Sequence, residues 1–148
     1  MLFAVCCLLF IEIGYAEYDK YFIDWGHHPE TKGAFSQKFV DIGNYLNSLL
    51  PETKKYVIVN EPGVPIPWPD GIPMTSQTPI FIERTIYGEP RTAYLKEDEI
   101  GKIEAGPNTV IVPMKFDEKL FDKLKELYPG GEVKNVNDDI LTYSFPCM

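Results

Sequence analysis

The sequence has few basic residues and no basic run longer than Lys54-Lys55. Fourteen lysines and arginines stand against 22 aspartates and glutamates, which gives a formal net charge of −8 and an isoelectric point of about 4.7. A chain with this charge repels phosphate backbones and anionic membrane surfaces. We therefore expect no nucleic acid among its partners.

Cysteine and histidine are scarce too, with three cysteines and two histidines. Cys6 and Cys7 are adjacent within an apolar run, and Cys147 lies at the other end of the chain, so no pair has the spacing of a zinc or redox site. The two histidines, His27 and His28, are also adjacent, and neighbouring side chains rarely both face one ion. The sequence therefore predicts no disulfide framework, no metal site and no cofactor.

The sequence also lacks the motifs of common catalytic sites, since it has no G-x-S-x-G, no Walker loop and no Rossmann glycine fingerprint. Glu61 and Asp70 could act as the acid and base of a glycoside hydrolase. Such carboxylates must lie about 5–10 Å apart, and nothing in the sequence spacing sets that distance. We predict no catalytic residue in this chain, and a free-standing hydrolase is the least supported hypothesis.

What the chain does contain is enough apolar sequence for one folded domain, with 148 residues of which 45% are hydrophobic. Its first residues, Met1 to Ile11 (MLFAVCCLLFI), form an uncharged run that fades by Ala16 and is shorter than the about 20 residues of a spanning helix. Three interpretations are open. The run is a signal peptide ending at Gly14-Tyr15-Ala16, the outer end of a membrane helix that starts upstream, or a buried element of the core.

Aromatic residues cluster directly after this run, at Tyr15, Tyr18, Tyr21, Phe22 and Trp25. Such rings favour the headgroup level of a bilayer, although an aromatic flap packed on the core is equally consistent with the pattern. We expect residues 1–16 to be a membrane-helix stub or signal segment. Residues 17–148 then form a membrane-associated domain on the extracytoplasmic face.

Hydrophobic periodicity predicts an α/β fold for this domain. A helix is expected from about Lys32 to Leu50, followed by a buried strand at 56–59 and a proline-stiffened loop from Glu61 to about Met74. Further along the chain we expect a short helix or a strand at 79–87; Thr78 would cap the helix and Gly88 would end it. Strands are expected at 92–95 and 109–112, followed by a helix capped by Asp117. The chain should end in a hairpin of 132–136 with 140–145, whose second strand has one covered and one more exposed face. The expected architecture is a small three-layer domain with a partly parallel sheet and a C-terminal β-hairpin.

Ligands of open α/β sheets bind beyond the carboxyl ends of the strands. The strand at 56–59 ends at Asn60 and Glu61, and the loop that follows carries Trp68, Asp70 and, further on, Gln77. An indole face with nearby amide and carboxylate groups suits a sugar ring. These five residues are the predicted binding site, although the loop could equally serve only to cover a sheet edge.

The residues from about 15 to 82 resemble the tail of prokaryotic C-type membrane glycosyltransferases, which are similar to dolichyl-phosphate mannose protein mannosyltransferases. The resemblance is carried by Tyr21-Phe22, Trp25, Pro29-Glu30, Ala34-Phe35, Ile42-Gly43-x-Tyr45-Leu46-Asn47, the strand from Lys55 to Val59, and Gly71-Ile72-Pro73-Met74-x-x-Gln77-Thr78-Pro79. In that family a final membrane helix leads into an extracytoplasmic soluble domain. The family's catalytic acids lie in an early loop with no counterpart here, so no catalytic residue is carried over.

The resemblance implies a non-catalytic accessory domain of an enzyme that uses a polyprenyl-phosphate-linked sugar donor. Its partner would be the membrane part of the same polypeptide or complex, on which it packs or for which it positions the acceptor. A glycan or the polyprenyl-phosphate sugar itself is a possible ligand. The alternative is a secreted or membrane-anchored carbohydrate-binding α/β module.

Overall fold

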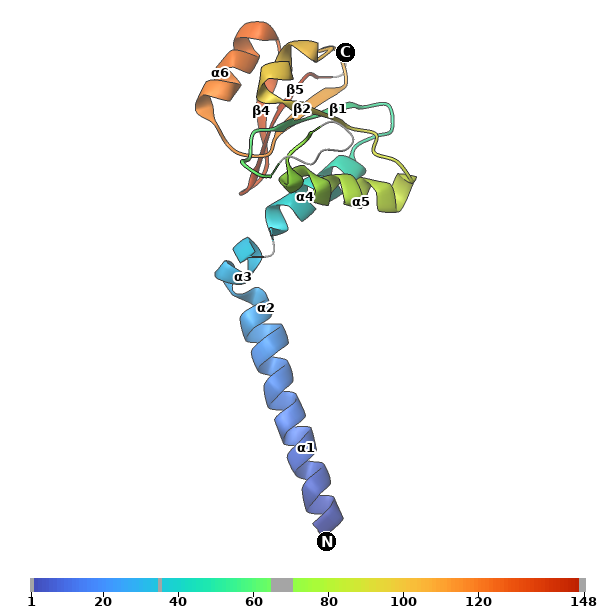
Figure 1. Ribbon diagram of the computed structural model, residues 1–148, viewed down its shortest axis with the longest axis vertical. Helices are drawn as coiled ribbons and strands as arrows, with labels where there is room; N and C mark the ends of the chain where they lie inside the picture. The colour runs from blue at the N-terminus through green and yellow to red at the C-terminus, as the bar shows by residue number, and fades with distance from the viewer. Residues whose placement is uncertain (1, 35, 65–70, 147–148) are drawn as a thin grey trace. The chain divides into compact units, whose positions relative to one another are not determined.

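A computed structural model of the chain describes residues 2–34, 36–64 and 71–146 (Figure 1). The chain forms two compact units, Met1–Gln37 and Lys38–Met148. The first unit consists of α1 (Leu2–Tyr18), the π-helix η1 (Asp19–Asp24), α2 (Trp25–His27) and α3 (Pro29–Ala34). Every described side chain of α1 is exposed. Within the described ranges, no helix has both the length and the apolar character required to cross a bilayer.

The second unit is built on a mixed sheet of five strands in the order β2-β1-β3-β5-β4. The strands are β1 (Lys54–Val59), β2 (Ala93–Lys96), β3 (Thr109–Pro113), β4 (Glu132–Asn137) and β5 (Ile140–Ser144). Strand β1 pairs in parallel with β2 and β3, and β5 pairs antiparallel with β3 and β4. The α/β class, the partly parallel sheet and the C-terminal hairpin are therefore confirmed.

Helices cover both faces of this sheet, because side chains along each strand point alternately to opposite sides. On one face, Val57 and Val59 of β1 pack with Ile42 and Leu46 of α4 (Gln37–Ser48). On the other face, Ile58 packs with the 3₁₀-helix η3 (Glu97–Lys102) and with α6 (Glu118–Leu127). Strand β1 is thus buried on both sides, as its β-branched run predicts.

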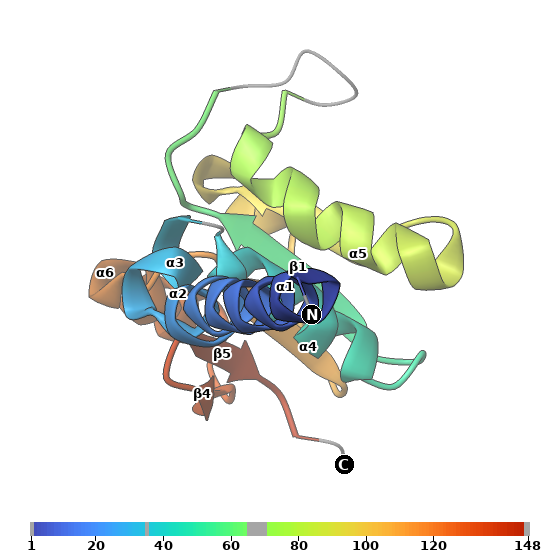
Figure 2. The ribbon, with the colours of Figure 1, turned by 90° about the horizontal axis from the view of Figure 1, so that it is seen from below.

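Helix α5 (Gln77–Tyr87) lies against α4 on the first face, where the Asn47 side chain of α4 donates to the carbonyl of Ile82 over 3.2 Å (Figure 2). Gly43 of α4 allows this close approach, because a Cβ there would lie 2.9 Å from the Cβ of Ile82 and 3.1 Å from the Cα of Pro79. Gly88 ends α5 in the left-handed conformation with a φ of 77°. Of the helix and strand predicted for this segment, the helix is correct.

Three local predictions were wrong. The helix expected from Lys32 to Leu50 is divided, since Ser36 has a φ of 54° that a right-handed helix does not tolerate. Phe35, which was expected on the apolar face of that helix, lies outside the described residues. Helix α5 begins before Thr78, so Thr78 is not its cap, and the short 3₁₀-helix η2 (Met74–Ser76) leads into it. Strand β5 has no exposed face, because Tyr143 packs with α6 on one side of the sheet and Thr142 faces Tyr45 of α4 on the other.

Candidate functional site

The carboxyl ends of the parallel strands meet at one edge of the sheet, and a reciprocal pair of hydrogen bonds joins two of them. The amide nitrogen of the Asn60 side chain donates to the carbonyl of Lys115 over 2.8 Å, and the Lys115 backbone N–H donates back to Asn60 Oδ1 over 2.8 Å. Asn60 thereby ties the end of β1 to the end of β3. Its side chain, one of those predicted to bind a ligand, therefore has a structural role.

The structure brings together only part of the predicted site. Glu61 follows Asn60 and is half-buried, and its Oε2 has no hydrogen-bond partner among the residues that the structure describes. Gln77 is the first residue of α5, and no described hydrogen bond joins its side chain to Asn60 or Glu61. Trp68 and Asp70 lie outside the described residues.

A pocket opens at the same carboxyl edge, with a volume of about 310 Å³. It is formed by the end of β3, the residues after it, the inner side of α6 and the turn between β4 and β5. The lining residues are Pro113, Lys115, Phe116, Phe121, Leu141 and the turn residues Asp138 and Asp139. The pocket therefore combines aromatic rings, one ammonium group and two carboxylates.

This pocket was not predicted, although the sequence contains a signal for it. Ligands bind beyond the carboxyl ends of all parallel strands in an open α/β sheet, not only beyond the first. Lys115 and Phe116 follow the next parallel strand in the same way. The contribution of Asp138 and Asp139 depends on the antiparallel pairing of β5 with β3, which brings the hairpin turn to this edge.

The Asn60 side chain is a direct test of how the carboxyl edge is held together. Asn60→Asp is expected to lower the free energy of unfolding by about 1 kcal/mol, because a carboxylate cannot donate to the Lys115 carbonyl. Urea denaturation of the full chain in detergent measures the change. Asn135→Asp, on the exposed strand β4, is the matched control and should change stability much less. Equal stability of the two variants would show that the Asn60 pair contributes nothing.

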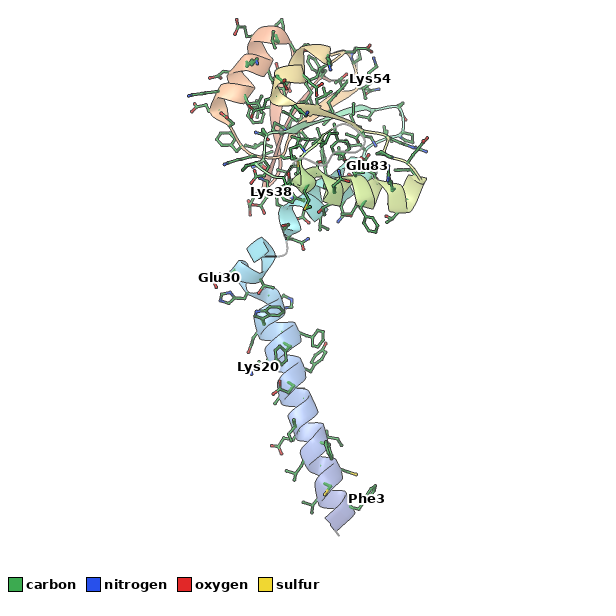
Figure 3. The ribbon with its side chains drawn as sticks, viewed as in Figure 1. Phe3, Lys20, Glu30, Lys38, Lys54 and Glu83 are labelled. Carbon is green, nitrogen blue, oxygen red and sulfur yellow. The ribbon has the colours of Figure 1, made fainter. Side chains whose placement is uncertain are left out.

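A buried polar network lies elsewhere, between α5 and the N-terminal ends of β1 and β2, and sequence reasoning did not identify it. Glu83 of α5, labelled in Figure 3, is fully buried. Its carboxylate accepts hydrogen bonds from the hydroxyls of Thr92 (2.5 Å) and Tyr94 (2.7 Å). The spacing of Glu83 three residues after Ile80 and four before Tyr87 was the available signal, since it places Glu83 on the buried face of α5.

Lys55 of β1 is the cationic member of this network. It is 3% exposed, and its Nζ donates to the carbonyl of Leu46 over 2.7 Å. Burial lowers the pKa of the Lys55 ammonium, while the charge of Glu83 opposes the shift and that of Arg91 adds to it. Burial also raises the pKa of the Tyr94 hydroxyl far above its usual range, and Glu83 acts in the same direction. These closely packed groups stabilise the interface between α5 and the sheet.

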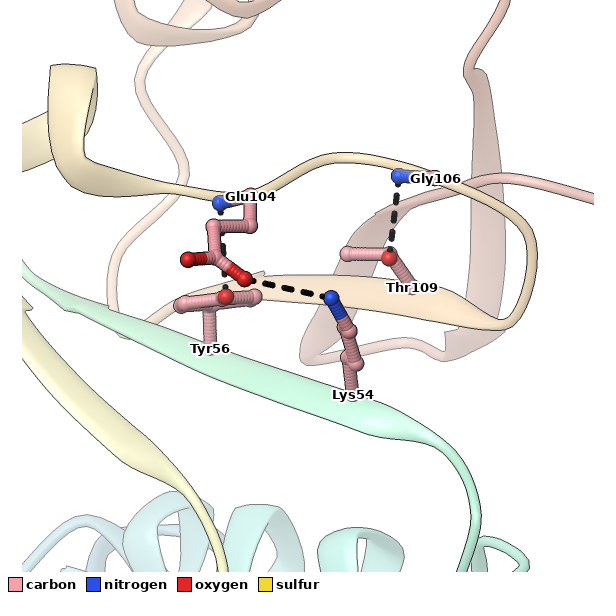
Figure 4. Close-up of polar contacts among 5 residues, drawn as sticks. All are labelled: Lys54, Tyr56, Glu104, Gly106 and Thr109. Carbon is pink, nitrogen blue, oxygen red and sulfur yellow. Dashed lines mark hydrogen bonds and ion pairs between the residues drawn. The ribbon is translucent and has the colours of Figure 1, made fainter.

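The amino edge of the sheet carries a set of exposed polar contacts, shown in Figure 4. Lys54 Nζ lies 3.2 Å from Glu104 Oε2, and the backbone N–H of Glu104 donates to the Tyr56 hydroxyl over 3.3 Å. The N–H of Gly106 donates to the Thr109 hydroxyl over 3.2 Å. The two contacts of Glu104 hold the segment between η3 and β3 against β1, and the Gly106–Thr109 bond closes the turn before β3.

The two histidines contact different groups. His27 Nδ1 lies 2.8 Å from the carbonyl of Ile23, and His28 Nδ1 accepts from the N–H of Glu30 over 3.4 Å. Across residues 2–34, 36–64 and 71–146, no three His, Cys, Asp or Glu side chains gather closely enough to hold a metal ion.

The pocket at the carboxyl edge is therefore the candidate ligand site of the described chain. The second notable feature is the exposed apolar surface of α1. Comparisons with known proteins add no assignment to either feature. No protein-family model, curated protein or solved structure matches this chain.

Proposed function

We propose that this chain is a membrane-attached, non-catalytic accessory domain of a membrane glycosyltransferase that uses a polyprenyl-phosphate-linked sugar donor. The observation that carries the membrane attachment is the exposure of α1. Its large apolar side chains include Phe3, Leu8, Phe10, Ile11 and Ile13, each more than half exposed. A helix that is apolar all round is ordinarily buried in a large core or in a membrane.

The distribution of these side chains around α1 favours lipid over a protein partner. With about 100° between successive residues of a helix, Phe3, Leu8 and Ile13 point in three well-separated directions. A docked helix or a flat protein surface would cover one side of α1 and leave the others in water. A bilayer covers every side at once.

The residues after α1 are of the kind that occupies a membrane interface. Tyr18 and Phe22 stack with their ring centroids 5.1 Å apart, and Lys20 Nζ lies 5.3 Å from the centroid of the Tyr21 ring. Rings with polar groups beside them suit the headgroup region, where one end of a side chain meets lipid and the other meets water. This arrangement supports a membrane entry between α1 and η1.

The glycosyltransferase assignment rests on the sequence resemblance. Under this proposal the domain lies on the extracytoplasmic face and packs on the membrane part of the same polypeptide or complex, or positions the acceptor there. The gene tests this assignment: the reading frame upstream of Met1 should encode several apolar spans, with Asp or Glu in the first outside loop. A stop codon and ribosome-binding site directly before Met1 would contradict it.

Membrane attachment is tested by flotation of the full chain, synthesised without cells in the presence of phosphatidylcholine vesicles. Neutral lipid is chosen because the chain has a net charge of −8. We expect the wild-type chain to float with the vesicles. The double variant Leu8→Asp/Ile11→Asp should stay at the bottom of the gradient, because each aspartate costs about 2.5–3.5 kcal/mol near the centre of a membrane helix.

The matched control is Phe81→Asp/Ile86→Asp, which alters two similarly exposed apolar residues of α5. This variant should float like the wild type. Loss of flotation in both variants, or failure of the wild-type chain to float, would overturn membrane attachment. A mature protein beginning at Glu17, found by mass spectrometry, would instead favour the signal peptide.

A further inference from the structure

We propose that the pocket at the carboxyl edge of the sheet binds a neutral saccharide ring. The inference goes beyond the membrane proposal and does not depend on it. The pocket's volume of about 310 Å³ lies at the lower end of the ~300–1,000 Å³ usual for small-molecule sites, which suits one or two sugar rings. Four separate parts of the fold contribute to it.

The aromatic wall of the pocket supplies the surface that a sugar ring needs. Phe116 is 62% exposed although it is a large apolar side chain, and its ring centroid lies 5.9 Å from that of Phe121. Phe121 is buried, and its contact with Phe116 holds the exposed ring in place. An exposed ring held in this way can cover the C–H face of a pyranose and remove both apolar surfaces from water.

The charged groups of the pocket have the right character for hydroxyls. The side chains of Lys115, Asp138 and Asp139 form no ion pair or hydrogen bond with the described residues, so all three are free to receive a ligand. Carboxylates accept hydrogen bonds from hydroxyls, and the ammonium group donates to them. A polyhydroxylated ring can satisfy both kinds of group at once.

The same groups argue against charged ligands. Two carboxylates beside one ammonium leave the pocket with a net negative charge, which repels phosphates and nucleotides. The same net charge attracts an amine, but the attraction is weak because the three charged side chains are exposed to water. A free amino acid could pair with both charges, but these three residues are all exposed, where ion pairs contribute little. A neutral ligand that gains most from ring stacking therefore fits the pocket better.

The test is saturation-transfer NMR on the full chain in detergent, with methyl α-mannoside, methyl β-glucoside and N-acetylglucosamine as probes. Leucine and inorganic phosphate represent the zwitterionic and anionic alternatives. At least one saccharide should bind, and Phe116→Ala should raise its dissociation constant about tenfold. Phe116→Trp retains an aromatic face and should keep the affinity near that of the wild type.

Phe81→Ala is the matched control, because Phe81 on α5 is 67% exposed and lies outside the pocket lining. It should leave saccharide affinity unchanged, whereas Asp138→Asn/Asp139→Asn should weaken it severalfold. The proposal is overturned if none of the saccharides binds, if only leucine or phosphate binds, or if Phe116→Ala and Phe81→Ala have equal effects. Circular dichroism of each variant verifies that the fold is intact.

Discussion

Glu83→Leu is expected to lower the free energy of unfolding by about 3–5 kcal/mol. Leucine approximates the size of glutamate but has no oxygen, so the hydroxyls of buried Thr92 and partly buried Tyr94 both lose their acceptor. The buried ammonium of Lys55 also loses the opposite charge of Glu83. Because whole domains are stable by only about 5–15 kcal/mol, the loss should be plain in a urea denaturation curve of the full chain in detergent.

Two further variants test whether the loss of stability comes from the buried hydrogen bonds of Glu83 or from the removal of a negative charge. Glu83→Gln keeps one acceptor oxygen and should lose less stability than Glu83→Leu. Glu89→Leu removes an exposed carboxylate just after α5 and should change stability by less than about 0.5 kcal/mol. If Glu83→Leu proved as stable as the wild type, packing alone would hold α5 on the sheet.

Gly131→Ala is expected to lower the free energy of unfolding by about 2–4 kcal/mol, because it adds a methyl group where a ring already lies. A Cβ at Gly131 would stand 2.6 Å from Cζ and 2.9 Å from the hydroxyl oxygen of Tyr143. Tyr143 is buried, and its hydroxyl donates to the Tyr128 carbonyl over 2.8 Å. The ring therefore cannot move aside without losing that bond.

The matched control for this variant is Gly106→Ala, because a Cβ at Gly106 would meet nothing within 4 Å. Its midpoint of urea denaturation should stay close to that of the wild type. The double variant Gly131→Ala/Tyr143→Leu removes the ring that clashes. It should be less destabilised than the sum of the two single variants, and strict additivity would show that the two positions do not interact.

Gly130 and Gly131 show how far a local pattern reaches. The sequence Pro129-Gly130-Gly131 predicts the end of a helix, and α6 does end there. Only Gly130 has the left-handed backbone that favours glycine, with a φ of 101°. At Gly131 a side chain is excluded by the ring of Tyr143 on β5, and no local signal in the sequence reveals that contact.

The candidate site also has one part that is visible locally in the sequence and one part that depends on a distant residue. Asn60 and Glu61 were predicted correctly to follow a buried strand, because an apolar β-branched run and its polar end are visible locally. The partner of Asn60 is Lys115, 55 residues away, and this pairing makes the Asn60 side chain a structural link between two strand ends. The sequence shows the Asn60 amide but not the Lys115 backbone groups to which it is hydrogen-bonded.

The helices and strands, the α/β class and the hairpin follow from hydrophobic spacing and from proline and glycine positions, since these act on the backbone within a few residues. The interruption at Ser36, the burial of Glu83 and the pocket around Phe116 depend on contacts between segments far apart in the chain. Such contacts exist only after the strands have taken their order and register, because pairing of β3 with β5 is what places the hairpin turn beside Lys115.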